Sequence, residues 1–118
     1  MSMIRRKDEL LVEFRQMFGG EGEAENRKIL RGSGEMAGKG RLFNHVVLQP
    51  GCEIAWHVHS GDCETYYILS GRGAYSDNGS MTELGPGDTS FVDDGEGHSI
   101  RCIGEEPLEL IALILYTG

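Results

Sequence analysis

The chain has 118 residues, of which 39% are hydrophobic and 25% charged, and its formal net charge is −8. This length suits one domain with a core of its own. The acidic balance disfavours nucleic-acid backbones and anionic membranes as partners. The most apolar run, residues 111–115, is too short to span a bilayer. Three cysteines without a CxxC pair, and no secretory signal, predict a cytoplasmic protein with reduced thiols.

Residues 1–40 are predicted to form an N-terminal extension that packs on the rest of the chain or on a partner subunit. A helix is favoured here, with Asp8 as its N-cap and Gly19 after its end. The apolar residues that follow helical spacing are Leu10, Leu11, Phe14, Met17 and Phe18. The alternation at residues 12–14 leaves a strand open as the alternative. Residues 27–31 are a strand candidate, and the glycine-rich residues 32–40 a loop.

From residue 41 onward the pattern predicts β-structure to the end of the chain. Asn78-Gly79 is a strong hairpin signal, because both central residues of a type I′ turn need positive φ. Many short strands separated by glycine-rich turns predict a sandwich or a barrel. The expected strands cover residues 41–49, 54–59, 64–70, 72–77, 80–84, 88–92, 98–103 and 108–116.

Three histidines and a glutamate form the clearest chemical pattern in the sequence. His57 and His59 are two residues apart on one strand, so their side chains share a face. Glu64 begins the next strand, and His98 begins a strand much later that closure of the sheet could bring to the same place. Imidazoles with one carboxylate suit Mn, Fe, Co, Ni or Zn rather than Ca or Mg. Four protein ligands would leave a position open for a substrate.

At these residues the chain resembles the cupin superfamily, in particular small single-domain microbial cupins. The first cupin motif, G(X)5HXH(X)3,4E(X)6G, is met at every position, namely Gly51, His57, His59, Glu64 and Gly71. The second motif, G(X)5PXG(X)2H(X)3N, is met at Gly87, Gly95 and His98, whereas Asp93 replaces its proline and Cys102 its asparagine.

The resemblance implies a double-stranded β-helix, or jelly-roll, barrel of two antiparallel sheets over residues 41–118. It also implies one divalent transition metal held inside by the three histidines and Glu64, and a homodimer. The last strand, residues 108–116, and residues 1–30 are the candidates for the dimer interface.

Other residues could act on a ligand in the barrel. Tyr66 shares the face of Glu64 by alternation and could donate a proton or a hydrogen bond, with core packing as the alternative. His45 is a candidate base, with a structural role as the alternative. Arg41 could clamp a carboxylate or form a surface ion pair. Met17, Phe18 and Met36 could cap the mouth of the barrel, with gap-filling packing as the alternative for the methionines.

Two functions remain open from the sequence. The first is a metalloenzyme that acts on a small oxygenated substrate, such as a carboxylate or a sugar acid, as an isomerase, a decarboxylase or lyase, or a dioxygenase. The second is a non-catalytic small-molecule-binding or sensor protein. Neither a membrane nor a nucleic acid is expected as a partner.

Overall fold

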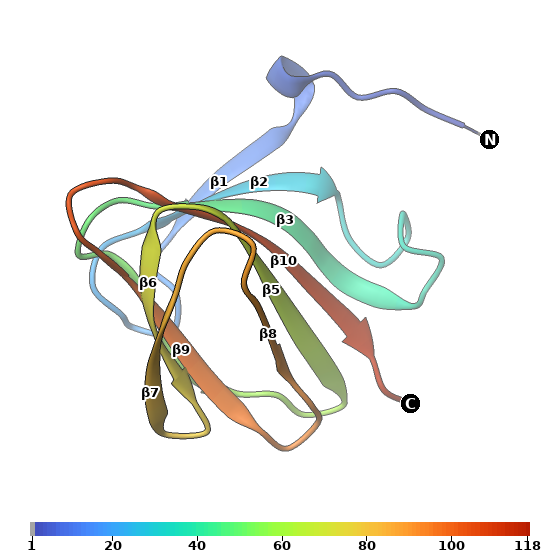
Figure 1. The fold of residues 1–118 in the computed structure, drawn as a ribbon. Helices are drawn as coiled ribbons and strands as arrows, with labels where there is room; N and C mark the ends of the chain where they lie inside the picture. Colours follow the sequence, from blue (N-terminus) through green and yellow to red (C-terminus); the bar gives the residue numbers. More distant parts are fainter. Residues whose placement is uncertain (1) are drawn as a thin grey trace.

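A computed structural model of the chain, described over residues 2–118, consists almost entirely of antiparallel strands in two facing sheets (Figure 1). The six-stranded sheet has the order β1-β2-β3-β10-β5-β8, and the four-stranded sheet has the order β4-β9-β6-β7. The strands are β1 (Leu11–Arg15), β2 (Ala24–Leu30), β3 (Gly40–Leu48), β4 (Glu53–Val58), β5 (Asp62–Ser70), β6 (Arg72–Asp77), β7 (Ser80–Leu84), β8 (Thr89–Val92), β9 (Gly97–Ile103) and β10 (Leu108–Tyr116).

The strands predicted after residue 40 are all present, with ends that differ by at most two residues from the prediction. The hairpin between β6 and β7 turns at Asn78 and Gly79, whose φ angles are 53° and 95°. The predicted all-β barrel of two antiparallel sheets is therefore confirmed.

The predicted N-terminal helix is wrong. Among residues 2–40 the only helical turn is a 3-10 turn at Lys7–Glu9, and Leu11–Arg15 forms β1 instead. This strand pairs with β2 from Leu11 opposite Lys28 to Arg15 opposite Ala24. Leu11 and Phe14 are 43% and 62% exposed, so the residues at helical spacing do not form a buried stripe. Main-chain pairing with β2 decided the conformation here.

The N-terminal residues extend the larger sheet. β2 pairs along β3, beginning with Ala24 opposite Leu48, and its Ala24 is part of the buried core. Further towards the N-terminus, the Arg5 guanidinium pairs with the Glu35 carboxylate at 2.9 Å and so ties the segment before β1 to the loop after β2. The division of the chain at residue 40 stays a prediction.

The core lies between the two sheets, near their middle. β10 runs between β3 and β5, and its inward residues Leu108, Leu110, Ala112 and Ile114 are buried. Leu108, Leu110 and Ala112 belong to one apolar cluster with Tyr75 and Ile100 of the smaller sheet. Within the described residues, no helix has the length and apolar character needed to cross a membrane.

Candidate metal centre

The structure brings together the four residues predicted from the two motifs, from both sheets of the barrel. His57 lies near the end of β4, opposite His98 of β9, and His59 follows β4 directly. Glu64 lies on β5 of the other sheet. One ligand atom of each residue lies within 4.8 Å of those of the others, and all four side chains are buried. The group could therefore hold a metal ion.

The three imidazoles direct the same nitrogen towards one carboxylate oxygen. The distances from Nε2 to Glu64 Oε1 are 3.3 Å for His57, 3.0 Å for His59 and 3.0 Å for His98. The Nε2 atoms of His57 and His98 are themselves 3.0 Å apart. Four such atoms within 4.8 Å of one another are an arrangement that could coordinate a cation.

The opposite nitrogens of the rings fix this orientation. His57 Nδ1–H donates to the Ala55 carbonyl at 2.8 Å, and His59 Nδ1–H donates to the Asp62 carboxylate at 2.7 Å. A neutral imidazole that donates from Nδ1 presents a lone pair at Nε2. In metal sites, such outer partners set the tautomer and orient the ligand. The donor set thus fits a divalent transition metal.

Electrostatics at the centre favour an ionised Glu64. Burial disfavours its charged form, but the hydrogen bonds that the three histidines donate when Nε2 carries a proton outweigh burial, and they hold the pKa of Glu64 below its usual range. The carboxylate of Glu64 in turn raises the pKa of His59, against the effect of burial, with Asp62 adding to it. A negative charge is therefore available at the centre of the imidazole group.

Asp62 links the centre to the wall of the barrel. One of its oxygens accepts from His59, and the other accepts from Arg41 Nε at 2.9 Å. The Asp62 side chain is buried, whereas that of Arg41 is 47% exposed. Asp62 was not among the residues predicted from the sequence. It lies two residues before Glu64, at the start of β5 and directly after the turn that follows β4, and this position was the available signal.

Tyr66 and Tyr75 pack around His98. The Tyr66 ring stacks on the His98 ring with centroids 4.7 Å apart, and the Tyr75 hydroxyl lies 2.8 Å from His98 Nδ1. Tyr66 is 1% exposed, and burial raises the pKa of its hydroxyl well above 10. The Tyr66 phenol therefore stays protonated and can donate a hydrogen bond, but it does not serve as a base near neutral pH.

A small pocket opens onto the metal group, as we call the four side chains of His57, His59, Glu64 and His98. Its cavity volume is about 60 Å³. Met17, Phe18, Arg41 and Tyr66 are among its lining residues. The Phe18 ring lies flat against the His57 ring, with centroids 4.1 Å apart and an interplanar angle of 8°. Phe18 holds a positive φ of 59° and is 58% exposed. Its place on the rim is fixed by the β1–β2 turn, which the predicted helix did not anticipate.

His45 lies apart from this group. It is on β3 opposite Ile111 of β10, is not among the residues that line the pocket, and pairs through Nε2 with the Glu109 carboxylate at 2.8 Å. A catalytic role for His45 stays a prediction.

The two departures from the second motif leave the ligands in place. The β8–β9 loop holds His59 by its main chain, because His59 N–H donates to the Glu96 carbonyl and Gly95 N–H to the His59 carbonyl. Asp93 N–H donates to the Glu96 side chain at 2.9 Å. Cys102 is buried, its thiol donates to the Glu106 carbonyl at 3.2 Å, and burial raises its pKa. These residues support the local fold.

Comparison with known proteins decides the family. A family model described as "Cupin domain" matches residues 44–114. The chain belongs to the cupins. It is 40% identical over 114 residues to the oxalate-binding protein of Thermotoga maritima. The aligned region covers 96% of this chain and 93% of that protein.

Solved cupin structures agree with the fold. The crystal structure of a predicted oxalate decarboxylase from Thermotoga maritima superimposes with a TM-score of 0.91 at 40% identity, over 97% of this cupin and 99% of that chain. A conserved double-stranded β-helix protein from Klebsiella pneumoniae gives a TM-score of 0.71 at 26% identity, over 98% of this cupin and 85% of that chain.

Proposed function

We propose that this cupin binds a divalent transition metal and takes a small carboxylate, of the size of oxalate, into the pocket beside it. The observation that carries the proposal is the convergence of three imidazole nitrogens and Glu64 at a pocket that Arg41 also lines. The cavity volume is about 60 Å³, several times the roughly 10–15 Å³ that a cavity needs to admit one water molecule. That space favours a ligand of a few heavy atoms over a sugar acid.

The metal ligands in this proposal are His57, His59, Glu64 and His98. Imidazole nitrogens with one carboxylate suit Mn, Fe, Co, Ni or Zn. Such a metal, when bound, supplies Lewis-acid polarisation of carboxylate oxygens. The Thermotoga relative named for oxalate binding supports a carboxylate as the ligand class.

The protein side chains then position the ligand. Arg41 uses Nε for Asp62, and among the described residues no carboxylate pairs with its other nitrogens, so these can bind the outer carboxylate of the ligand. Phe18 covers one side of the pocket and excludes water from His57. Tyr66, which stays protonated, is placed to donate a hydrogen bond or a proton to a bound anion.

The decisive experiment has two stages. The metal content of full-length protein purified without a chelating column is measured first, and calorimetric titration with oxalate follows. We expect about one metal per chain in the wild type, and loss of the metal together with the metal-dependent part of oxalate binding in His57→Ala. Unchanged metal content in His57→Ala would refute the site.

Turnover is tested separately. We propose that the metal-loaded protein consumes oxalate or a related small carboxylate, and that Tyr66→Phe slows this reaction without loss of metal. Metal-loaded protein that binds oxalate but leaves its concentration unchanged would instead establish the non-catalytic binding function.

We also propose a homodimer through the outer face of the six-stranded sheet. This face exposes large apolar side chains on β5, β8 and β10, including Tyr67, Phe91 and Leu115. A second copy of the chain would remove this apolar surface from water. Light scattering is expected to give a dimer mass for the wild type and a monomer mass for Phe91→Lys; a monomeric wild type would contradict the proposal.

A further inference from the structure

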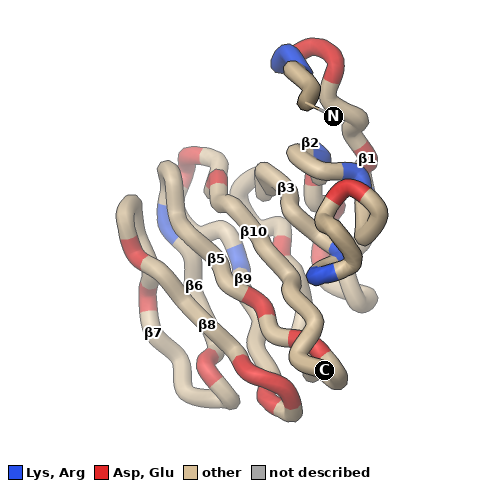
Figure 2. The backbone as a smooth tube through the Cα atoms, turned by 90° about the vertical axis from the view of Figure 1, so that its right-hand side faces the viewer, with Lys and Arg blue, Asp and Glu red and all other residues tan. Residues whose placement is uncertain are grey.

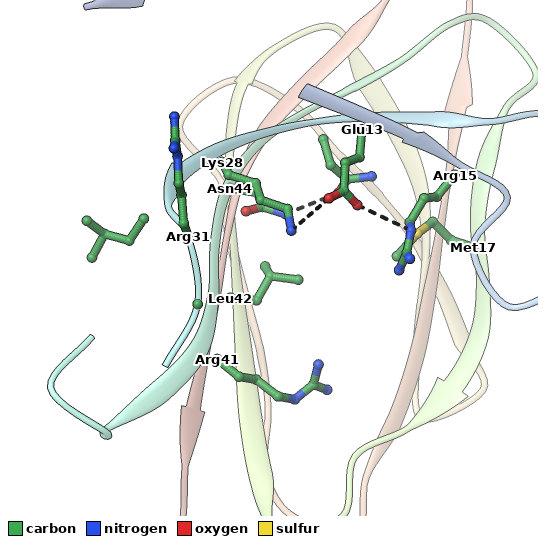
Figure 3. A pocket seen from close by; sticks show the side chains of 11 residues that line it. Glu13, Arg15, Met17, Lys28, Arg31, Arg41, Leu42 and Asn44 are labelled. Carbon is green, nitrogen blue, oxygen red and sulfur yellow. Dashed lines mark hydrogen bonds and ion pairs between the residues drawn. The ribbon is translucent and has the colours of Figure 1, made fainter. Parts of the chain in front are cut away.

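A second pocket, separate in its lining from the metal ligands, lies against β1, β2 and the start of β3. Figure 3 shows its side chains, which come from these three strands and from residues just after β1 and just after β2. Its cavity volume is about 90 Å³. It shares Met17, Asn26, Arg41 and Leu42 with the pocket at the metal group, so the two are neighbours.

The lining of this second pocket is strongly basic in an acidic protein. It contains four cationic side chains and a single carboxylate, that of Glu13; the cations are Arg15, Lys28, Arg31 and Arg41. The net charge of the whole chain is −8, and only two of its 11 Lys and Arg residues, Arg72 and Arg101, lie after residue 41. In Figure 2 most of the basic residues lie in the N-terminal part of the chain, around β1, β2 and the start of β3, and two lie apart on the smaller sheet.

Internal pairing satisfies only part of this positive charge. Glu13 pairs with Lys28 at 3.1 Å and with Arg15 at 3.4 Å, the contacts drawn as dashed lines in Figure 3. Over residues 2–118, the Arg31 guanidinium has no carboxylate partner, and it donates to the Glu9 carbonyl at 3.0 Å. Arg41 has one carboxylate contact, through Nε. Two guanidinium groups thus keep free donors beside the cavity.

The wall behind the cations is polar as well. Asn26 and Asn44 are 5% and 4% exposed, although strand positions that face the interior of a barrel are usually apolar. Asn44 Nδ2 donates to Asn26 Oδ1 at 3.3 Å, and Asn26 Nδ2 donates to the Ala24 carbonyl at 3.2 Å. Each of these amide nitrogens carries a second N–H. Buried amide donors and guanidinium groups are the chemistry that recognises oxyanions.

We propose that this second pocket, lined by Lys28, Arg31, Arg41 and the two buried asparagines, is an anion-binding site for a small oxyanion, distinct from the metal centre. Its chemistry is shared by organic carboxylates and by inorganic phosphate. The site needs none of the metal ligands, so it can bind an anion whether or not the proposed function of the metal centre holds. Arg41 faces both pockets and places the anion beside the entrance to the metal group.

The experiment titrates the full-length chain, stripped of metal and dialysed, with oxalate and with inorganic phosphate by calorimetry at low salt. We expect saturable binding of about one anion per chain that weakens as salt is added. Tighter binding of oxalate or of phosphate identifies the class of ligand. If neither oxalate nor phosphate binds saturably to the metal-free protein, the proposal is overturned. That result would leave the proposed function standing, because metal binding and oxalate binding by the metal-loaded protein are measured separately.

Three variants test the assignment of residues. Arg31→Gln is expected to reduce the affinity for the anion by about tenfold, which corresponds to the loss of one charge-assisted hydrogen bond. Arg101→Gln is the control, because Arg101 is an exposed arginine of β9 that pairs with Glu53 and does not line the pocket. Glu13→Gln is expected to strengthen binding, because it removes the one carboxylate that competes with the anion. Equal affinities for Arg31→Gln and Arg101→Gln, or weaker binding in Glu13→Gln, would overturn the assignment.

Discussion

Asp62→Asn tests whether the outer partner of His59 tunes the proposed metal site. The Asp62 carboxylate is 6% exposed and accepts two hydrogen bonds, from His59 Nδ1 at 2.7 Å and from Arg41 Nε at 2.9 Å. Asparagine has the same shape, but one acceptor oxygen becomes an NH2 donor that must face another N–H. The substitution also removes the negative charge that makes His59 Nε2 a better electron donor.

The expected loss is about 10- to 100-fold in metal affinity, the usual effect of removing such an outer partner. It corresponds to about 1.4–2.7 kcal/mol of binding free energy. The affinity is measured by competition between the full-length protein and a chromophoric chelator for Zn²⁺ at fixed pH, and circular dichroism checks that the variant is folded.

Glu109→Gln provides a matched control for Asp62→Asn. It breaks a similar carboxylate–histidine pair, with 2.8 Å between Glu109 Oε1 and His45 Nε2, outside the pocket that holds the metal group. We expect Glu109→Gln to keep the wild-type affinity for Zn²⁺. An affinity of Asp62→Asn within about twofold of the wild type, or an equal loss in both variants, would refute the reasoning about outer partners.

Three further predictions concern the rim of the pocket, the motif glycines and acid stability. Phe18→Ala should release metal to a chelator about two- to tenfold faster than the wild type, since the lost stack on His57 contributes about 0.5–1.5 kcal/mol. Phe14→Ala is the control, because Phe14 is similarly exposed. Equal release rates in the two variants would contradict the covering role of Phe18. Gly71→Ala should lower the free energy of unfolding, measured with urea, by about 2–3 kcal/mol more than Gly51→Ala does. Both glycines have φ near 80°, but a Cβ at Gly71 would overlap the Pro107 carbonyl oxygen, whereas a Cβ at Gly51 would meet nothing within 4 Å. Equal losses of stability in the two variants would show that the overlap relaxes. The hydrogen bond from the Arg5 guanidinium lowers the pKa of Glu35 from 4.5 to about 2. The contribution of Glu35 to stability should therefore be complete above pH 4.5 and be lost as the pH falls towards 2. An NMR titration of the Glu35 carboxyl with a midpoint near 4.5 would contradict this prediction.

The sequence by itself determined the barrel and the four residues of the candidate metal site. Strand alternation and turn residues are local properties, so the strands after residue 40 and the Asn78-Gly79 turn could be predicted from short stretches of chain. The spacing of His57 and His59 already placed both rings on one face. The cupin motif added Glu64 and His98, although no local rule brings residues 34 positions apart into contact.

The tertiary structure alone decided the groups around the ligands. Residues 11–15 carry both a helical and a strand pattern, and pairing with β2 settled the choice. That pairing makes the turn that places Phe18 on His57, and it adds Lys28 of β2 to the basic pocket. The Asp62–Arg41 contact joins residues 21 positions apart. Such contacts depend on how the strands pair across the sheet, which single-sequence patterns do not specify, because the side-chain period fixes a face but not a neighbour.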